Sequence, residues 1–303
     1  MTMTTRREKT RAVRNTLVRD TLDLSVPLAE KRAAWERTAA SLPLVPGTRC
    51  TPETVGGVPC LWVSASSARA NATLVYVHGG GLVEGSVNTH REFASRLSDR
   101  CGLQVLLVDY RLAPEHPFPA AREDVRAVLA ALAPRETGTD TAHRVFAGGD
   151  SSGAGLVLSA LLNDESHTLA FPAVQKLVLL SGVYDHTVSG SSYTNKRVVD
   201  PVVSEAVLHH CAALYAGAHD TRNPLISPLF ATFSTLPPTL VMVGTDEILL
   251  SDSERLASTL SRAGIEVDLH IGQDLWHAWP LYPDLPDADE ALETIRVFLH
   301  AGG

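Results

Sequence analysis

Ser151 lies in the sequence glycine-aspartate-serine-serine-glycine, which begins at Gly149 and ends at Gly153. An apolar stretch at 144–148 precedes this motif and a run of small residues at 152–162 follows it, so it joins a predicted strand to a predicted helix. A strand-to-helix turn this tight leaves room only for small residues two positions either side of the serine. Ser151 is therefore the candidate nucleophile, although the same letters taken alone indicate only a turn.

Three consecutive glycines behind a histidine form a second and rarer feature, in which His78, Gly79, Gly80 and Gly81 follow a short apolar strand. Attack on an acyl carbon creates an oxyanion, and backbone without side chains can present N–H donors at about 3 Å from it. We expect the amides of Gly80 and Gly81 to be two donors and the amide of Ser152 to be the third. A flexible turn is the alternative interpretation of the glycines, and His78 is expected to brace the loop rather than act as a base.

An acid and a histidine should follow the serine, in that order along the chain. A predicted strand at 239–243 ends just before Asp246 and Glu247, and His277 stands on a loop after a further strand at 267–271. His277 is the candidate general base, which takes the serine proton and returns it to the leaving group. We favour Glu247 as the acid that orients the imidazole and keep Asp246 as the alternative, because adjacent residues point in different directions.

Together these motifs resemble the hormone-sensitive-lipase (HSL, family IV) group of α/β-hydrolase carboxylesterases. The resemblance rests on the loop at 78–81, on Asp150 before the serine and on the segment 109–121, and it covers the chain from about 72 to 277. It implies that His78, Gly79 and Asp150 support the oxyanion loop. The proline-rich segment 109–121 is expected to brace the same loop.

The sequence departs from the family pattern at two places. Members usually carry an aspartate followed by x-leucine-x-aspartate, whereas here Glu247 and Asp252 are spaced one residue wider. This variant resembles the subgroup with a glutamate as triad acid, and it leaves Asp246 open. Ser152 also stands where alanine is commoner, a change that keeps the backbone donor.

Charge and composition exclude several function classes. The net charge of −8 argues against a nucleic-acid or anionic-membrane surface, because both require a cationic face. No apolar run reaches the length of a membrane span and no signal-peptide core follows the first charges, so we expect a cytoplasmic protein. A basic cluster near the N-terminus is expected to be a solvated helix face or a frayed terminus, and it comprises Arg6, Arg7, Lys9, Arg11 and Arg14.

The four cysteines show no spacing typical of a metal site; they are Cys50, Cys60, Cys101 and Cys211. We therefore expect no metal and no cofactor. Cys50 and Cys60 flank 52–57, an expected hairpin turn that would bring them near each other, but free thiols are the expected state in a cytoplasmic chain.

Short apolar runs alternate with helical segments, a pattern typical of an α/β protein with a mainly parallel sheet and helices on both faces. We expect strands at 60–64, 74–77, 104–110, 145–148, 176–180, 239–243 and 267–271, and helices at 88–100, 122–133 and 152–162. The resemblance makes this the α/β-hydrolase fold.

Two segments interrupt the alternation and are expected to form a helical cap: an N-terminal segment, 1–47, and an insertion, 184–236. The catalytic domain would then comprise 48–183 and 237–303. In the resembling family such segments cover the active site. Trp276 and Trp279 beside the candidate base are expected either to line the substrate pocket or to pack in the core.

The favoured function is hydrolysis of short-acyl or acetyl esters of small molecules through an acyl-serine intermediate. An amidase or lactone hydrolase would use the same residues, and a non-catalytic binding protein on the same fold is the alternative from a different class. The expected partners are a small-molecule ester and water, with no nucleic acid and no membrane; a homodimer is compatible with the sequence.

Overall fold

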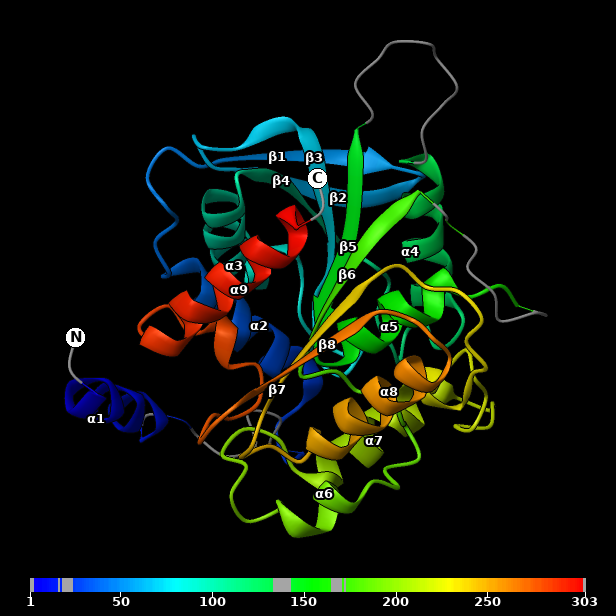
Figure 1. Ribbon diagram of the computed structural model, residues 1–303. Helices are drawn as coiled ribbons and strands as arrows, with labels where there is room; N and C mark the ends of the chain where they lie inside the picture. The colour runs from blue at the N-terminus through cyan, green and yellow to red at the C-terminus, as the bar shows by residue number, and fades with distance from the viewer. Residues whose placement is uncertain are drawn as a thin grey trace.

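The computed structural model describes residues 3–15, 17, 24–132, 143–164, 171 and 173–301. Within these residues the strands form one twisted sheet of eight, in the order β1-β2-β4-β3-β5-β6-β7-β8 (Figure 1). The strands are β1 (Arg49–Val55), β2 (Val58–Ser64), β3 (Arg69–Val77), β4 (Leu103–Val108), β5 (Arg144–Asp150), β6 (Val174–Leu180), β7 (Thr239–Gly244) and β8 (Val267–Gly272). Strands β1 and β2 are antiparallel to their neighbours, and all pairs from β4 to β8 are parallel.

Helices cover both faces of the sheet, as Figure 1 shows. Helices α3 (Val87–Cys101) and α9 (Pro286–His300) pack on one face, and α4 (Ala120–Ala131), α5 (Ser152–Leu161) and α8 (Leu250–Arg262) pack on the other. Alternate residues of a strand point to opposite faces, so Leu74 and Tyr76 pack with α3 whereas Val75 and Val77 pack with α5. Because both faces are covered, the central strands read as nearly continuous apolar runs.

Local signals fix the start and end of α3, the helix that follows the glycine-rich loop. The Ser86 hydroxyl accepts the amides of Asn88 and Thr89, and the Thr89 hydroxyl accepts the Ser86 amide, which makes a capping box. Gly102 ends the helix in the left-handed conformation at φ 64°. These caps anchor the helix close behind the loop.

The α/β-hydrolase architecture expected from the sequence is confirmed, and each expected strand is present with its bounds moved by a few residues. Strand β1 was not predicted, because it lies at the sheet edge with six of its seven residues exposed and so lacks an apolar pattern. The hairpin expected at 52–57 is present, but its turn is shorter than expected: the strand continues to Val55, and the chain reverses at Gly56 and Gly57. Cys50 then pairs with Val63 rather than approaching Cys60, and all four thiols are free.

The first described residues form α1 (Met3–Arg14) and α2 (Leu28–Ala40). Helix α1 lies against α9, where the Arg6 guanidinium donates to Asp287 at 3.0 Å and to Glu290 at 2.7 Å. The expectation of a solvated basic cluster is therefore wrong for Arg6 and for Arg14, whose partners come from distant parts of the chain, while Lys9 and Arg11 are exposed. Part of the segment 1–47, namely 1–2, 16 and 18–23, lies outside the described residues, as does the last residue of the helix expected at 122–133.

The segment between β6 and β7 carries α6 (Ser191–Asn195), α7 (Glu205–Ala216) and the short 3-10 helix η1 (Pro228–Phe230). Helix α7 begins after Ser204, whose hydroxyl accepts the Val207 amide and so caps the first turn of the helix. None of the helices in the described part of the chain combines the length and the apolar character needed to cross a bilayer.

Candidate active site

Ser151 sits on the turn between β5 and α5 with φ 52° and ψ −127°, a conformation that lifts it out of the strand. Its amide donates to the Leu180 carbonyl at 2.8 Å, which ties the turn to β6. A side chain at Gly149 or Gly153 would overlap the backbone carbonyl of Val77 on β3. The close approach of β3 therefore explains why the residues two positions either side of the serine are glycines.

The glycine-rich loop leaves β3 directly beside this turn. Gly80 and Gly81 have φ 116° and 63°, and a side chain would meet the Glu84 carbonyl oxygen at Gly80 and the Cys211 sulfur at Gly81. Among the described residues, no acceptor takes the backbone amides of Gly80, Gly81 or Ser152. Two unpartnered amides on the loop and one on the neighbouring serine turn are thus available as donors, as a site that binds an oxyanion requires.

The Asp150 carboxylate binds the start of the glycine-rich loop through the Gly79 amide. One carboxylate oxygen, Oδ1, accepts the Tyr76 hydroxyl at 2.9 Å and the Gly79 amide at 3.2 Å, and lies 3.3 Å from His90 Nε2. Burial by itself raises the pKa of Asp150, but His90 and the Tyr76 hydroxyl outweigh burial and lower it below the ordinary value. The carboxylate therefore stays charged and keeps its donors.

His78 is buried beneath the same loop. Its Nδ1 lies 2.8 Å from the Gly79 carbonyl oxygen, and its ring stacks on Tyr110 with centroids 4.3 Å apart. The Tyr110 hydroxyl donates to the His78 carbonyl at 2.8 Å. Burial lowers the pKa of His78 to about 3, so the ring is neutral near pH 7.

The Ser152 hydroxyl joins the turn to the glycine-rich loop. It accepts the Leu82 amide at 3.1 Å, and the Leu82 carbonyl accepts the Ala113 amide at 2.9 Å. The hydroxyl that distinguishes this chain from the commoner alanine thus makes a contact between two parts of the candidate site. The second bond shows that the segment 109–121 contacts the loop.

Glu247 follows β7 and His277 follows β8, and their side chains meet. In the sheet, β6 separates β7 from β5, the strand that leads to Ser151. His277 Nδ1 is 3.1 Å from Glu247 Oε2, and both side chains are buried. The other oxygen, Oε1, accepts the Ser181 hydroxyl at 2.9 Å and the Gly244 amide at 2.5 Å. The carboxylate is therefore held on one oxygen while the other faces the imidazole.

The environment of His277 favours its protonated form. Burial by itself lowers the pKa of the imidazole, but the hydrogen bond and charge of Glu247 raise it, as do the charges of Asp200 and Asp150. The net pKa lies above the ordinary value of 6.5. An imidazole in this setting is suited to accept a proton from a neighbouring hydroxyl.

Asp246 faces away from the imidazole. Its carboxylate lies 2.6 Å from Arg14 Nη1, and the same guanidinium donates to the Val199 carbonyl at 2.7 Å. The adjacent acidic residues therefore have different neighbours: Glu247 contacts His277, and Asp246 contacts α1.

Ser181, just after β6, is a residue of the site that the sequence did not reveal. Its backbone has φ 46°, and its buried hydroxyl donates to Glu247 while accepting the Ala278 amide at 2.9 Å. One hydroxyl thus links the acid to the residue that follows His277. The only sequence signal was its place at the end of a predicted strand.

Comparison with known families agrees with this arrangement. A family model described as alpha/beta hydrolase fold matches residues 74–281, which contain every candidate site residue. A crystal structure of an esterase from the bacterial hormone-sensitive lipase family superposes with a TM-score of 0.86, at 35% identity over 99% of this chain and 98% of that one. The chain belongs to the hormone-sensitive-lipase group of α/β-hydrolase carboxylesterases.

Curated relatives and a further crystal structure support the assignment of this carboxylesterase to its family. An acetyl-hydrolase of Streptomyces hygroscopicus is 34% identical over 89% of this chain and 88% of its own length. An esterase of Acinetobacter venetianus is 31% identical over 88% and 87%. The crystal structure of a hormone-sensitive lipase from a metagenome library gives a TM-score of 0.85 at 34% identity, covering 98% and 97%.

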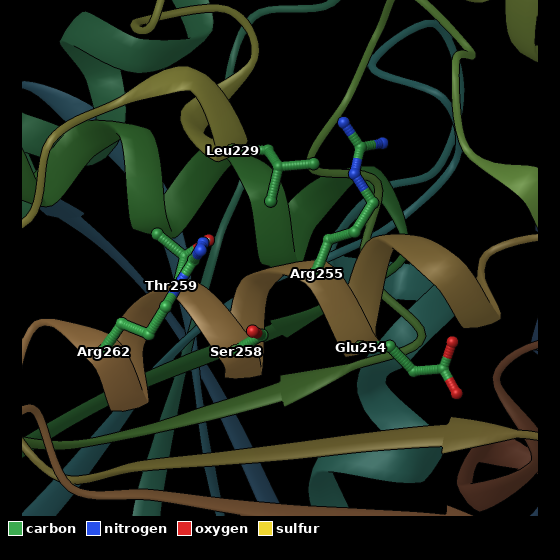
Figure 2. Close-up of a pocket in the computed structure, with 6 residues that line it drawn as sticks. All are labelled: Leu229, Glu254, Arg255, Ser258, Thr259 and Arg262. Atoms are coloured by element: carbon green, nitrogen blue, oxygen red, sulfur yellow. The ribbon is translucent and has the colours of Figure 1, made fainter.

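Two tryptophans beside His277 and one surface hollow are not part of the candidate active site of the carboxylesterase. Trp276 and Trp279 are buried in the core between α9 and the sheet, so of the two expected roles the structure favours packing. A hollow of about 410 Å³ lies on α8 and η1, lined by Leu229, Glu254, Arg255, Ser258, Thr259 and Arg262 (Figure 2). No cluster of three or more metal-binding side chains occurs among the residues described.

Proposed function

We propose that this carboxylesterase hydrolyses short-acyl or acetyl esters of small molecules through an acyl-enzyme on Ser151. The observation that carries the proposal is the Glu247–His277 contact, at the same sheet edge as the turn that carries the half-buried Ser151 and three unpartnered amides. Each of these parts serves a different need of acyl transfer.

In the first half-reaction, the Ser151 hydroxyl oxygen bonds to the ester carbonyl carbon while Nε2 of His277 takes its proton. The carbonyl oxygen becomes an oxyanion, which the amides of Gly80, Gly81 and Ser152 stabilise. The tetrahedral intermediate collapses, the bond to the alcohol oxygen breaks, and His277 returns the proton to the departing alkoxide. The products of this step are the alcohol and the acyl-serine.

In the second half-reaction, water replaces the alcohol. His277 takes a proton from water as its oxygen bonds to the acyl carbon, and the same amides hold the second oxyanion. Collapse releases the carboxylic acid and returns the proton to the serine. All the groups required belong to the chain, and the reaction consumes one water molecule per ester.

Glu247 is proposed as the triad acid, with Asp246 outside the triad. The Glu247 carboxylate contacts Nδ1 and so fixes the tautomer that presents Nε2 to the serine. Its charge also stabilises the imidazolium formed in each half-reaction. Asp246 is instead paired with Arg14, and this ion pair accounts for its orientation.

The segments 1–47 and 184–236 are proposed to form the cap over the site, with 48–183 and 237–303 as the catalytic domain. Helix α2 reaches the glycine-rich loop through Arg32, which donates to the Val83 carbonyl at 2.7 Å. Helix α7 places the Cys211 sulfur beside Gly81, at 2.5 Å from where a Cβ would stand. This close cover limits the room above the oxyanion site and favours small acyl groups, in keeping with the relative named acetyl-hydrolase.

The test is hydrolysis of p-nitrophenyl esters of increasing acyl length by the wild type and by Ser151→Ala. We expect activity in the wild type alone, with the highest kcat/KM for acetyl or butyryl esters. Equal rates for the two proteins on every ester would refute the proposal, and amide and lactone substrates would then be assayed. An optimum at long acyl chains would refute the proposed substrate class while leaving the nucleophile in place.

A further inference from the structure

Asp200 is a fully buried carboxylate in the insertion between β6 and β7. Its Oδ1 accepts the amides of Val202 at 2.8 Å and Val203 at 3.0 Å, and its Oδ2 accepts the amide of Ile248 at 2.9 Å. The net pKa of Asp200 lies above its ordinary value because burial raises it, although nearby His277 and these amides oppose the rise. All three partners are donors, so the hydrogen-bond pattern is that of an ionised carboxylate.

The third of these bonds reaches the acid of the proposed triad. Ile248 directly follows Glu247, whose Oε2 lies 3.1 Å from His277 Nδ1. From the sheet side, Ser181 and the Gly244 amide hold the Glu247 carboxylate itself. From the insertion side, Asp200 holds the backbone one residue further on, so the loop that carries the acid is fastened on two sides.

We propose that Asp200 is a positioning residue for ester hydrolysis, which fixes the loop carrying Glu247 and adds a negative charge to those of Glu247 and Asp150 near His277. This inference rests on the proposed function, because it assigns Asp200 a part in the same reaction. It also gives the insertion a role in turnover, in addition to covering the site.

Three carboxylates act on the His277 imidazole, each from a different element. Glu247 follows β7, Asp150 ends β5, and Asp200 comes from the insertion; all three raise the pKa of His277 against the lowering effect of burial. Burial raises the pKa of Tyr282, and the charge of Asp200 adds a smaller rise, which places that ring in the same neighbourhood. Since the imidazole becomes a cation in both half-reactions, a fixed negative charge near it stabilises the transition state more than the ground state.

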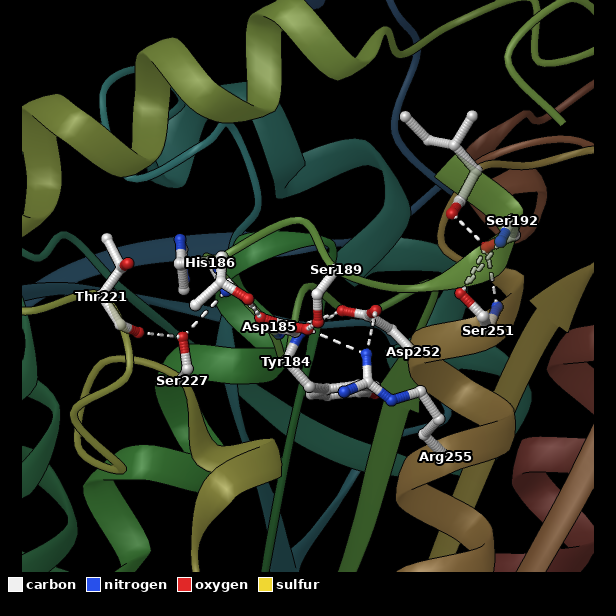
Figure 3. Close-up of polar contacts among 12 residues, drawn as sticks. Tyr184, Asp185, His186, Ser189, Ser192, Thr221, Ser227, Ser251, Asp252 and Arg255 are labelled. Carbon is white, nitrogen blue, oxygen red and sulfur yellow. Dashed lines mark hydrogen bonds and ion pairs between the residues drawn. The ribbon is translucent and has the colours of Figure 1, made fainter. Parts of the chain in front are cut away.

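The test compares Asp200→Asn with a matched control, Asp185→Asn. Asp185 is a buried carboxylate of the same insertion that accepts the Thr187 amide at 2.9 Å and pairs with Arg255 at 2.8 Å, on the side facing α8 (Figure 3). Unlike Asp200, it is not among the main charges that shift the pKa of His277. Both substitutions remove one buried charge from the insertion, but only Asp200→Asn removes one of the main charges that raise the pKa of His277.

For Asp200→Asn we expect kcat to fall about 10- to 100-fold, the effect of losing one charged hydrogen bond, with KM almost unchanged. The acidic limb of the kcat/KM profile should move to lower pH, because without the Asp200 charge the neutral His277 imidazole is favoured. Asp200→Glu, which keeps the charge, should leave the limb nearer the wild-type position than Asp200→Asn does. Asp185→Asn should lower the melting temperature and leave the limb in place.

The pKa of His277 is also read directly by proton NMR, with His277→Gln identifying the resonance, and this readout needs no turnover. A pKa and an acidic limb that coincide in Asp200→Asn and the wild type would overturn the inference, as would an equal shift in Asp185→Asn. If Asp200→Asn does not fold, Asp200→Ser keeps an acceptor without the charge and supports the same comparison. Failure of the proposed function is recognised separately, by a wild type no more active than Ser151→Ala.

Discussion

Replacement of Ser181 by alanine isolates one hydroxyl that serves both the proposed acid and the loop of the proposed base. The change removes the 2.9 Å bond to the Glu247 carboxylate and the 2.9 Å bond from the Ala278 amide. A hydrogen bond to a charged group contributes about 1.5–3 kcal/mol, and a buried amide left unpaired costs about 1–3 kcal/mol. Alanine keeps the same backbone preferences at φ 46°, so the difference reports the hydroxyl alone.

We expect the free energy of unfolding of Ser181→Ala to fall by about 3 kcal/mol or more, measured by urea denaturation. Loss of the hydrogen bond to the Glu247 carboxylate also affects the reaction, since a less well oriented Glu247 holds the imidazole less firmly. At about 1.4 kcal/mol per factor of ten, kcat should fall roughly 10- to 100-fold, measured with p-nitrophenyl acetate at saturation. KM should change little, because Ser181 is fully buried and its hydroxyl is already engaged by Glu247 and the Ala278 amide.

Ser227 supplies a matched control inside the insertion. Its buried hydroxyl also accepts one amide, that of His186 at 2.8 Å, and donates to one oxygen, the Thr221 carbonyl at 2.6 Å (Figure 3). Ser227→Ala should therefore destabilise the fold without lowering kcat. If Ser181→Ala retains kcat within about twofold of wild type, or if Ser227→Ala loses as much, the link from hydroxyl to acid to imidazole is refuted.

Three further predictions follow from the same geometry. Glu247→Gln should lower kcat by orders of magnitude and Asp246→Asn by little; a comparable loss in both would contradict the assignment of the acid. The acidic limb of kcat/KM should have its midpoint above about 6.5, because the neutral imidazole of His277 is the proposed base and its pKa is raised; a midpoint below that value would count against this environment. Ser152→Ala should lose about 1–3 kcal/mol of stability by leaving the buried Leu82 amide without its acceptor, with kcat largely kept because the proposed donor is backbone; unchanged denaturation midpoints would show that the hydroxyl does not contribute.

The sequence predicted the candidate site best where reactive residues directly follow strands, because the chain direction then decides at which edge of the sheet they lie. The candidate serine, acid and histidine each follow an apolar run, and parallel strands bring their carboxyl ends to one edge of a sheet, so their proximity was predictable. The glycines around Ser151 were equally readable, because the close contact with β3 excludes larger residues. The edge strand β1 escaped prediction because its residues face solvent and show no apolar pattern.

Contacts between distant segments were beyond sequence reasoning. Nothing in the order Asp246, Glu247 tells which carboxylate faces the histidine, since the answer depends on Arg14, 232 residues away, and on the path of the loop. Ser181 and Asp200 carry no motif, and their places near the proposed acid arise only when β6 and the insertion are brought beside β7. The same is true of Arg6, whose partners lie at the opposite end of the chain.

The guanidinium of Arg14 contacts the loop after β7 and the insertion at once, through Asp246 and the Val199 carbonyl. An engineered chimera that exchanges the insertion for that of a relative would therefore disturb more than substrate choice. We expect selectivity and rate to be coupled, because the insertion proposed to cover the substrate also touches the loop that carries the proposed acid. A transplanted insertion would retain full turnover only if it brought its own counterpart of these contacts, and an N-terminal helix able to reach them.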